Sequence, residues 1–172
     1  MRVHTLHRQQ TFDRTPGEVF AFFAAPENLA VITPPWLAFR ILTPLPLEVR
    51  TGSLIDYTIR WLGVPVRWTT LITDHRPPLK FVDQQIRGPY TLWHHEHTFE
   101  AIAGGGTRMT DRVTYALPFG VAGDFAHRFL VRRQLDEIFD YRAAAIARMF
   151  PRRTGEVAGT PPHVRQTMET RS

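Results

Sequence analysis

The chain has 172 residues, of which 43% are hydrophobic, so it can form one domain with a sizeable core but not comfortably two domains. It contains no cysteine, which excludes disulfide frameworks, thiolate nucleophiles and cysteine-ligated zinc or iron–sulfur sites. The formal net charge is +5, but the 21 basic residues include a single lysine, and the arginines are scattered singly or in short pairs. Nucleic-acid binding needs clustered positive charge, so we expect no nucleic-acid partner.

The N-terminal residues show no apolar stretch that could form the core of a signal peptide. Nowhere do about 18 uncharged apolar residues follow one another, as a membrane-spanning helix requires. We therefore expect a cytoplasmic protein without a membrane span.

The first elements predicted are a strand and a short helix. Residues 3–12 alternate loosely between polar and apolar, which is typical of a strand with one solvated face. Thr15 is expected to cap the helix, with Pro16 at its first position and Glu18 closing a capping box. The helix should end near Ala25, because the proline that follows disfavours helical backbone in the residue before it.

The middle of the chain predicts an antiparallel meander. One further helical turn is expected over residues 27–32, and after it the pattern is strand after strand, with glycines in several of the turns. The expected strands cover residues 36–42, 53–62, 65–74, 80–87, 90–103 and 107–116. No helix intervenes between them, so neighbouring strands should pair antiparallel.

A long helix is predicted near the C-terminus, because the apolar period changes from 2 to 3.6 over residues 125–149. We interpret its charged residues as a solvated outer face: Arg132, Arg133, Asp136, Glu137 and Asp140. Residues 151–172 are poor in apolar side chains and have no period, which predicts a disordered tail behind a single domain at 1–150.

This order of elements predicts an α+β fold in which a curved antiparallel sheet of about seven strands wraps around the long helix, with two short helices after the first strand. A strongly twisted sheet cannot fill its own concavity with one helix, so a cavity is expected. The inward faces carry bulky rings: Tyr57, Trp61, Trp68, Phe81, Trp93, Phe99 and Tyr115. Such rings beside a few polar groups are typical of small-molecule sites, although they could also simply pack a core.

A series of short motifs extends over about residues 3–150: APENL at 25–29, ITP at 32–34, IDY at 55–57, FVDQQ at 81–85, GPY at 88–90, WHHEHTF at 93–99, GTRMTD at 106–111, YALPFG at 115–120 and IFDYR at 138–142. This series resembles the START-like helix-grip superfamily called SRPBCC, and within it a bacterial branch whose members are often labelled cyclase/dehydrase-like. The superfamily includes polyketide cyclases, aromatases and lipid-transfer domains. The resemblance implies the helix-grip fold and a cavity for a hydrophobic ligand, but no particular reaction.

The segment 93–99 carries the candidate chemistry. Strand alternation places four of its side chains on one face: Trp93, His95, His97 and Phe99. On the next strand, Asp111 shares a face with Met109 and Tyr115, and the glycine turn between the strands puts Asp111 opposite His97 or Phe99. We therefore expect His97 and Asp111, together with His95, to share one patch of the cavity wall.

The candidate ligand-binding residues combine the inward rings, this polar patch and the inner stripe of the long helix. They are Tyr57, Trp61, Trp68, Phe81, Trp93, His95, His97, Phe99, Met109, Asp111, Tyr115, Phe129, Leu135, Ile138, Phe139 and Arg142.

Three interpretations of the polar patch stay open. The first is a buried polar network, in which Asp111 and Arg142 satisfy each other or the histidines. The second is that His95 and His97 hold the polar end of an apolar ligand, or act as general acid and base with Asp111 fixing a tautomer. The third is a metal site built from two histidines and a carboxylate, but the sequence shows no third ligand and no HExxH-type spacing, so we expect neither a metal nor a cofactor.

The leading functional hypothesis is the binding of a small hydrophobic molecule, such as a lipid, a polyketide or an aromatic metabolite. One alternative is a polyketide cyclase or dehydratase-type enzyme that uses His95, His97 and Asp111. Another is a protein-interaction domain without a ligand. Either a monomer or a homodimer is compatible with the sequence.

Overall fold

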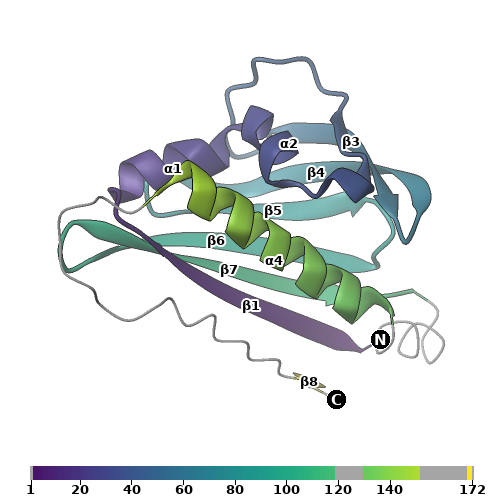
Figure 1. Cartoon of the computed structure of the whole chain (residues 1–172). Helices are drawn as coiled ribbons and strands as arrows, with labels where there is room; N and C mark the ends of the chain where they lie inside the picture. The colour runs from purple at the N-terminus through teal and green to yellow at the C-terminus, as the bar shows by residue number, and fades with distance from the viewer. Residues whose placement is uncertain (1, 119–129, 152–169, 172) are drawn as a thin grey trace.

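A curved antiparallel sheet and one long helix dominate the structure, a computed structural model that describes residues 2–118, 130–151 and 170–171 (Figure 1). The elements in chain order are β1 (Val3–Phe12), α1 (Pro16–Ala24), a 3₁₀ turn (Pro26–Asn28), α2 (Leu29–Ile32), a second 3₁₀ turn (Pro35–Leu37), β2 (Arg40–Ile41), β3 (Leu54–Trp61), β4 (Val64–Arg76), β5 (Lys80–Arg87), β6 (Leu92–Ile102), β7 (Gly106–Ala116), α4 (Arg132–Met149) and β8 (Thr170–Arg171).

The sheet has the strand order β2-β3-β4-β5-β6-β7-β1-β8, and every neighbouring pair is antiparallel. β2 to β7 form the predicted meander, and β1 pairs with the free edge of β7. α4 lies across one face of the sheet, with α1 and α2 beside it (Figure 1). The predicted α+β helix-grip fold, with about seven strands and two short helices after the first strand, is confirmed.

β8 is an eighth, two-residue strand that the sequence analysis did not predict. It pairs Arg171 with Val3 and Thr170 with His4, because the edge of β1 away from β7 offers unpaired backbone groups there. The rest of the predicted disordered tail, residues 152–169 and 172, lies outside the described residues.

The capping box of α1 forms as predicted. The backbone N–H of Glu18 donates to the Thr15 hydroxyl at 3.4 Å, and the backbone N–H of Thr15 donates to the Glu18 carboxylate at 2.9 Å. The helix ends at Ala24, and Ala25 is already extended, as expected before a proline.

The predicted strand over residues 36–42 is wrong for most of its length. Pro34 and Pro35 fix backbone angles that start a 3₁₀ turn, and the left-handed Ala38 (φ 45°) ends it, so only Arg40–Ile41 pairs as β2. The apolar pattern of this segment has another cause, since Leu37 is buried and the Trp36 ring packs edge-on against Tyr141 of α4 with 5.5 Å between centroids.

The turn between β5 and β6 is closed by a side chain. The Gln85 amide donates to the backbone carbonyl of Tyr90 at 2.7 Å and accepts from the Tyr90 N–H at 3.3 Å, so β6 begins at Leu92 rather than at residue 90. A Cβ on Gly88 would lie 2.3 Å from the Gln85 side-chain oxygen, which explains the glycine at that position.

α4 joins two apolar clusters of the core. Leu135 and Phe139 pack with residues of the sheet centre, while Ile146 packs with α1 and with the ends of β1, β6 and β7. Phe125 and Phe129, which the sequence analysis placed on the same helix, lie outside the described residues. Within the described ranges, no helix combines the length and the apolar character needed to cross a membrane.

The outer face of α4 is charged as predicted, with one exception. Arg133 and Glu137 form the expected i,i+4 ion pair at 2.9 Å on the exposed side. Asp136 instead reaches toward the sheet and pairs with the buried Arg8 of β1 at 2.5 Å. A buried arginine needs such a partner, because an unpaired buried charge is costly.

Gly106 provides a test of the β1–β7 packing. A Cβ on this residue would lie 2.6 Å from the backbone carbonyl oxygen of Phe12, where no flexible side chain can yield. We expect Gly106→Ala to lower the free energy of unfolding by about 1–3 kcal/mol, measured by urea denaturation. The matched control is Gly17→Ala in α1, where nothing lies within 4 Å of the added Cβ, and it should be neutral or slightly stabilising. Equal unfolding midpoints for Gly106→Ala and the unmodified protein would contradict this packing.

Candidate functional site

A cavity of about 180 Å³ lies between the sheet and α4. Its wall is formed by residues of β3, β4, β5, β6 and α4 and by the segment from the end of α1 to β2. The apolar and aromatic members are Phe23, Ala24, Pro26, Leu29, Leu37, Phe39, Val49, Ile55, Tyr57, Ile59, Trp61, Trp68, Ile72, Phe81, Tyr90, Trp93, Leu135, Ile138 and Phe139, and the polar ones are Thr33, Thr70, Asp83, His95, His97, Gln134 and Arg142. The cavity is therefore mainly apolar, with few polar groups.

The aromatic part of the wall is a set of rings that hold one another in place around Trp68. Trp68 stacks on Tyr57 with 5.9 Å between centroids and meets Trp93 edge-on at 5.3 Å. The Trp61 indole N–H donates to the Tyr90 hydroxyl at 3.1 Å. Burial raises the pKa of Tyr57 and of Tyr90, so both hydroxyls stay neutral. This side of the cavity is rigid and uncharged.

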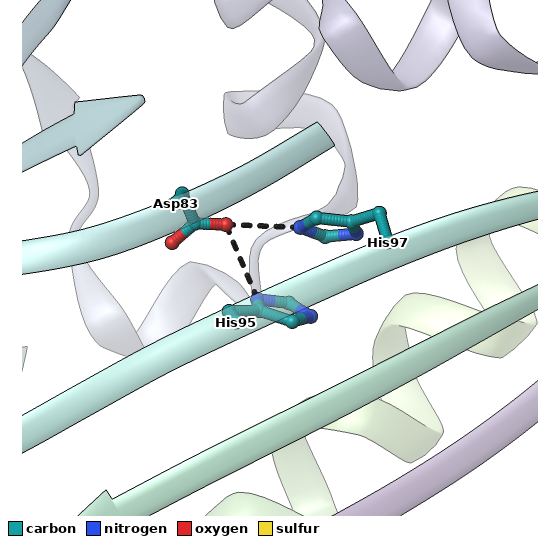
Figure 2. A group of neighbouring side chains, drawn as sticks. All are labelled: Asp83, His95 and His97. Atoms are coloured by element: carbon teal, nitrogen blue, oxygen red, sulfur yellow. Dashed lines mark hydrogen bonds and ion pairs between the residues drawn. The ribbon is translucent and has the colours of Figure 1, made fainter. Parts of the chain in front are cut away.

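The polar part of the wall centres on two histidines of β6, shown with Asp83 in Figure 2. His95 and His97 lie two residues apart on one face of the strand, and their rings are 3.8 Å apart between centroids. Asp83 of β5 lies opposite His95 in the strand register, and Asp111 of β7 lies opposite His97. The register therefore gives both rings a carboxylate on either side.

Each carboxylate uses one oxygen for both rings. Asp83 Oδ2 is 2.9 Å from His97 Nε2 and 3.5 Å from His95 Nδ1. Asp111 Oδ1 is 3.0 Å from His95 Nε2 and 2.7 Å from His97 Nδ1, although the last contact is too poorly aligned for a hydrogen bond and acts as a close ion contact. All four ring nitrogens thus face a carboxylate oxygen.

The ionisable groups of this polar wall shift one another's pKa values. Burial alone would raise the pKa of Asp83 and Asp111, but the histidines and Arg142 outweigh burial and hold both pKa values below the usual one. Burial and the charge of His97 lower the pKa of His95. Burial alone would lower the pKa of His97, but its contacts with the two carboxylates raise it. The two carboxylates therefore favour the charged form of His97, whereas burial and the charge of His97 favour the neutral form of His95.

Besides His97 Nδ1, two buried nitrogens of wall residues have no hydrogen-bond partner among the described residues. They are the indole Nε1 of Trp68 and the guanidinium Nε of Arg142, both buried. The Arg142 guanidinium lies over the Phe23 ring, 5.3 Å from its centroid. Because an unsatisfied buried donor is costly, these groups favour a polar ligand atom or an ordered water in the cavity.

Eleven of the sixteen candidate residues line the cavity: Tyr57, Trp61, Trp68, Phe81, Trp93, His95, His97, Leu135, Ile138, Phe139 and Arg142. Four others lie behind the wall and do not reach its surface. Three of these are buried in the core: Phe99, Met109 and Tyr115. Strand alternation places them on the inward face of the sheet, but at positions that α1 or α4 covers. Asp111 lies behind His95 and His97 and contacts both of them. Phe129 lies outside the described residues.

Several wall residues were missed by the sequence analysis. Tyr90 was assigned to a strand rather than to the site. Asp83 was not among the candidate site residues, because its contact with His97 depends on the β5–β6 register. The segment from the end of α1 to β2 was predicted as local structure only, although its apolar residues Leu29, Leu37 and Phe39 line the cavity. The apolar residues of that segment were the sequence signal that could have placed it at the cavity.

The fold is shared with proteins of known structure. An aromatase/cyclase called Zhui from Streptomyces sp. R1128 superposes with a TM-score of 0.62 at 15% identity, over 90% of this chain and 99% of that chain. A START superfamily protein from Mycobacterium smegmatis superposes with a TM-score of 0.62 at 12% identity, over 86% and 97%. At such low identity these likenesses show the fold alone. Among curated proteins the sequence has no significant match.

The sequence itself matches one family model, described as polyketide cyclase / dehydrase and lipid transport, over residues 13–139. This match extends from the turn before α1 to the middle of α4 and so includes the entire cavity wall of the sheet. The chain therefore belongs to this polyketide cyclase / dehydrase and lipid transport family, within the SRPBCC-like helix-grip proteins.

Proposed function

We propose that the protein binds a small hydrophobic molecule with one polar oxygen in the cavity between the sheet and α4. The observation that carries this proposal is the division of the wall into an aromatic side and a polar side that holds the two histidines, Asp83 and Arg142. An apolar cavity with a few convergent polar groups is the usual make-up of a ligand site. The family description, which names both enzymes and lipid transport, is compatible with it.

The size of the cavity favours a ligand of one or two rings. Its volume is about 180 Å³, whereas an apolar cavity of about 150 Å³ is known to accept a benzene molecule. A long lipid chain needs more room than this, so an aromatic metabolite or a short polyketide fragment fits the wall better. Arg142 provides positive charge and a buried donor, its Nε, for a carboxylate, phenol or carbonyl oxygen.

Filling the cavity tests where the ligand binds. Ile138 of α4 lines the cavity, and Ile138→Trp places a larger ring there, so we expect its affinity for 2-naphthol to fall at least tenfold in isothermal titration calorimetry. Glu137→Trp is the matched control, because it puts the same side chain at the neighbouring exposed position of α4 and should bind as the unmodified protein does. Equal affinities in the two variants would place the binding elsewhere.

The polar wall is tested by a pair of probes that share a ring system. A charge-assisted hydrogen bond contributes about 1.5–3 kcal/mol, so Arg142→Met should weaken the binding of 2-naphthoate roughly tenfold or more. The uncharged 2-naphthol should lose less than about threefold, since its rings contact the aromatic wall. Calorimetry with both probes gives the comparison. A parallel loss for the two probes would mean that Arg142 supports the fold rather than the polar end of the ligand.

A cyclase or dehydratase-type reaction is the second candidate, favoured by the two histidines that each contact carboxylates at the cavity wall. Such reactions begin with proton abstraction next to a carbonyl.

Hydrogen–deuterium exchange of the acetophenone methyl group, followed by NMR, separates the two candidates. If the protein only binds its ligand, the exchange rate should be the same with the unmodified protein and with His95→Gln. Faster exchange that His95→Gln abolishes would replace the binding proposal with the enzyme.

A further inference from the structure

The side of the histidine pair that faces Asp83 has the geometry of a metal site. Asp83, His95 and His97 each offer one ligand atom, and these three atoms lie within 4.8 Å of one another (Figure 2). The oxygen is 2.9 Å from the His97 nitrogen and 3.5 Å from the His95 nitrogen. Donor atoms held about 2.1 Å from a shared ion lie about 3.0 Å apart at right angles and about 3.4 Å apart at the tetrahedral angle. The two oxygen–nitrogen distances therefore match those between donor atoms around one ion.

The opposite side of the pair has the geometry of an outer shell. Asp111 Oδ1 lies beside the remaining nitrogen of each ring: it is hydrogen-bonded to His95 Nε2 at 3.0 Å and in close contact, without hydrogen-bond alignment, with His97 Nδ1 at 2.7 Å. Histidines that bind a metal usually direct their other ring N–H to a carboxylate, which fixes the tautomer and the ring orientation. In the tautomer that puts the N–H group of each ring toward Asp111, both histidines turn lone pairs toward Asp83.

Two lone pairs and a carboxylate oxygen that converge on one point repel each other unless a positive charge lies between them. A proton on His97 can satisfy one of the two contacts, but it leaves His95 Nδ1 and Asp83 at 3.5 Å without a hydrogen bond. One divalent cation satisfies all three atoms at once. The three residues lie on adjacent strands, β5 and β6, and are buried or nearly so, so their positions are rigid.

We propose that Asp83, His95 and His97 bind a divalent transition-metal ion at the cavity wall, with Asp111 as the positioning residue behind them. Two imidazoles and one carboxylate suit ions such as Zn²⁺, Co²⁺ or Fe²⁺, whereas Mg²⁺ and Ca²⁺ prefer oxygen ligands alone. All three residues line the cavity. The remaining coordination positions therefore face the cavity, where a ligand oxygen can occupy one. This inference does not depend on the nature of the hydrophobic ligand.

The test is titration of the EDTA-treated, dialysed protein with Co²⁺, followed by visible absorption and by calorimetry. We expect saturation at one equivalent, with a d–d spectrum typical of nitrogen and oxygen ligands. Asp83→Asn and His95→Gln should each weaken binding by roughly 100-fold or more, and Asp111→Asn, which acts from the outer shell, by about 10–100-fold. His94→Gln is the matched control, because His94 lies between the two histidines on the opposite face of β6 and should leave the affinity unchanged.

The outcomes separate this proposal from the proposed function. If the unmodified protein shows no saturable Co²⁺ binding but still binds 2-naphthol, the metal site is wrong and the cavity proposal stands. Equal Co²⁺ affinity in the unmodified protein and both Asp83→Asn and His95→Gln would overturn the assigned ligands. Circular dichroism of each variant establishes that it is folded. Because the unmodified protein alone can fail the test, the proposal stays falsifiable even if a variant does not fold.

Discussion

The rest of the structure depends on one constraint, the burial of four ionisable side chains on one face of the sheet. They are Asp83, His95, His97 and Asp111. Buried charges are costly unless they are paired and hydrogen-bonded. The structure meets this requirement through strand register, which puts Asp83 opposite His95 and Asp111 opposite His97. Arg142 of α4 adds a positive charge that lowers the pKa of Asp111 and of Asp83. A shift of one residue in either strand pair would separate these groups, so the polar wall favours a single register and a single position for the helix.

The aromatic side of the cavity follows from the same arrangement. α4 contacts the sheet through Leu135 and Phe139 at one end and through Ile146 at the other. Between these contacts and the polar wall, the helix leaves a space that the rings around Trp68 border but do not fill. The rings hold one another by edge and stacking contacts and by the bond between Trp61 and Tyr90. A preorganised wall of this kind lowers the ordering cost of binding a rigid ligand.

Local patterns account for what could be predicted from the sequence. The change of apolar period identified the long helix, and the Thr15 capping box identified the start of α1. The alternation in residues 93–99 placed His95 and His97 on one face, and the glycine turn after them limited the partner of Asp111 to His97 or Phe99; the structure selects His97. These predictions rest on short-range geometry.

Long-range packing explains what could not be predicted. The contact of Asp83 with His97 depends on the β5–β6 register, which the Gln85 side chain helps to set by closing the turn at Tyr90. The strand predicted over residues 36–42 was wrong because its apolar pattern reflects packing, such as that of Trp36 on α4. An apolar pattern in so short a segment does not reveal the backbone conformation. Phe99, Met109 and Tyr115 point inward as expected, but only the placement of the helices decides which inward residues border the cavity.

A crystal structure with bound 6-bromo-2-naphthol tests the central claim most directly, because the anomalous signal of bromine locates the ligand without prior assumptions. The claim is that one cavity, with an aromatic side and a polar side, holds a small hydrophobic molecule. The account predicts a single bromine site between the sheet and α4, with the naphthol oxygen directed toward Arg142 and His95. Bromine sites confined to the outer surface, with no density in the cavity, would contradict it.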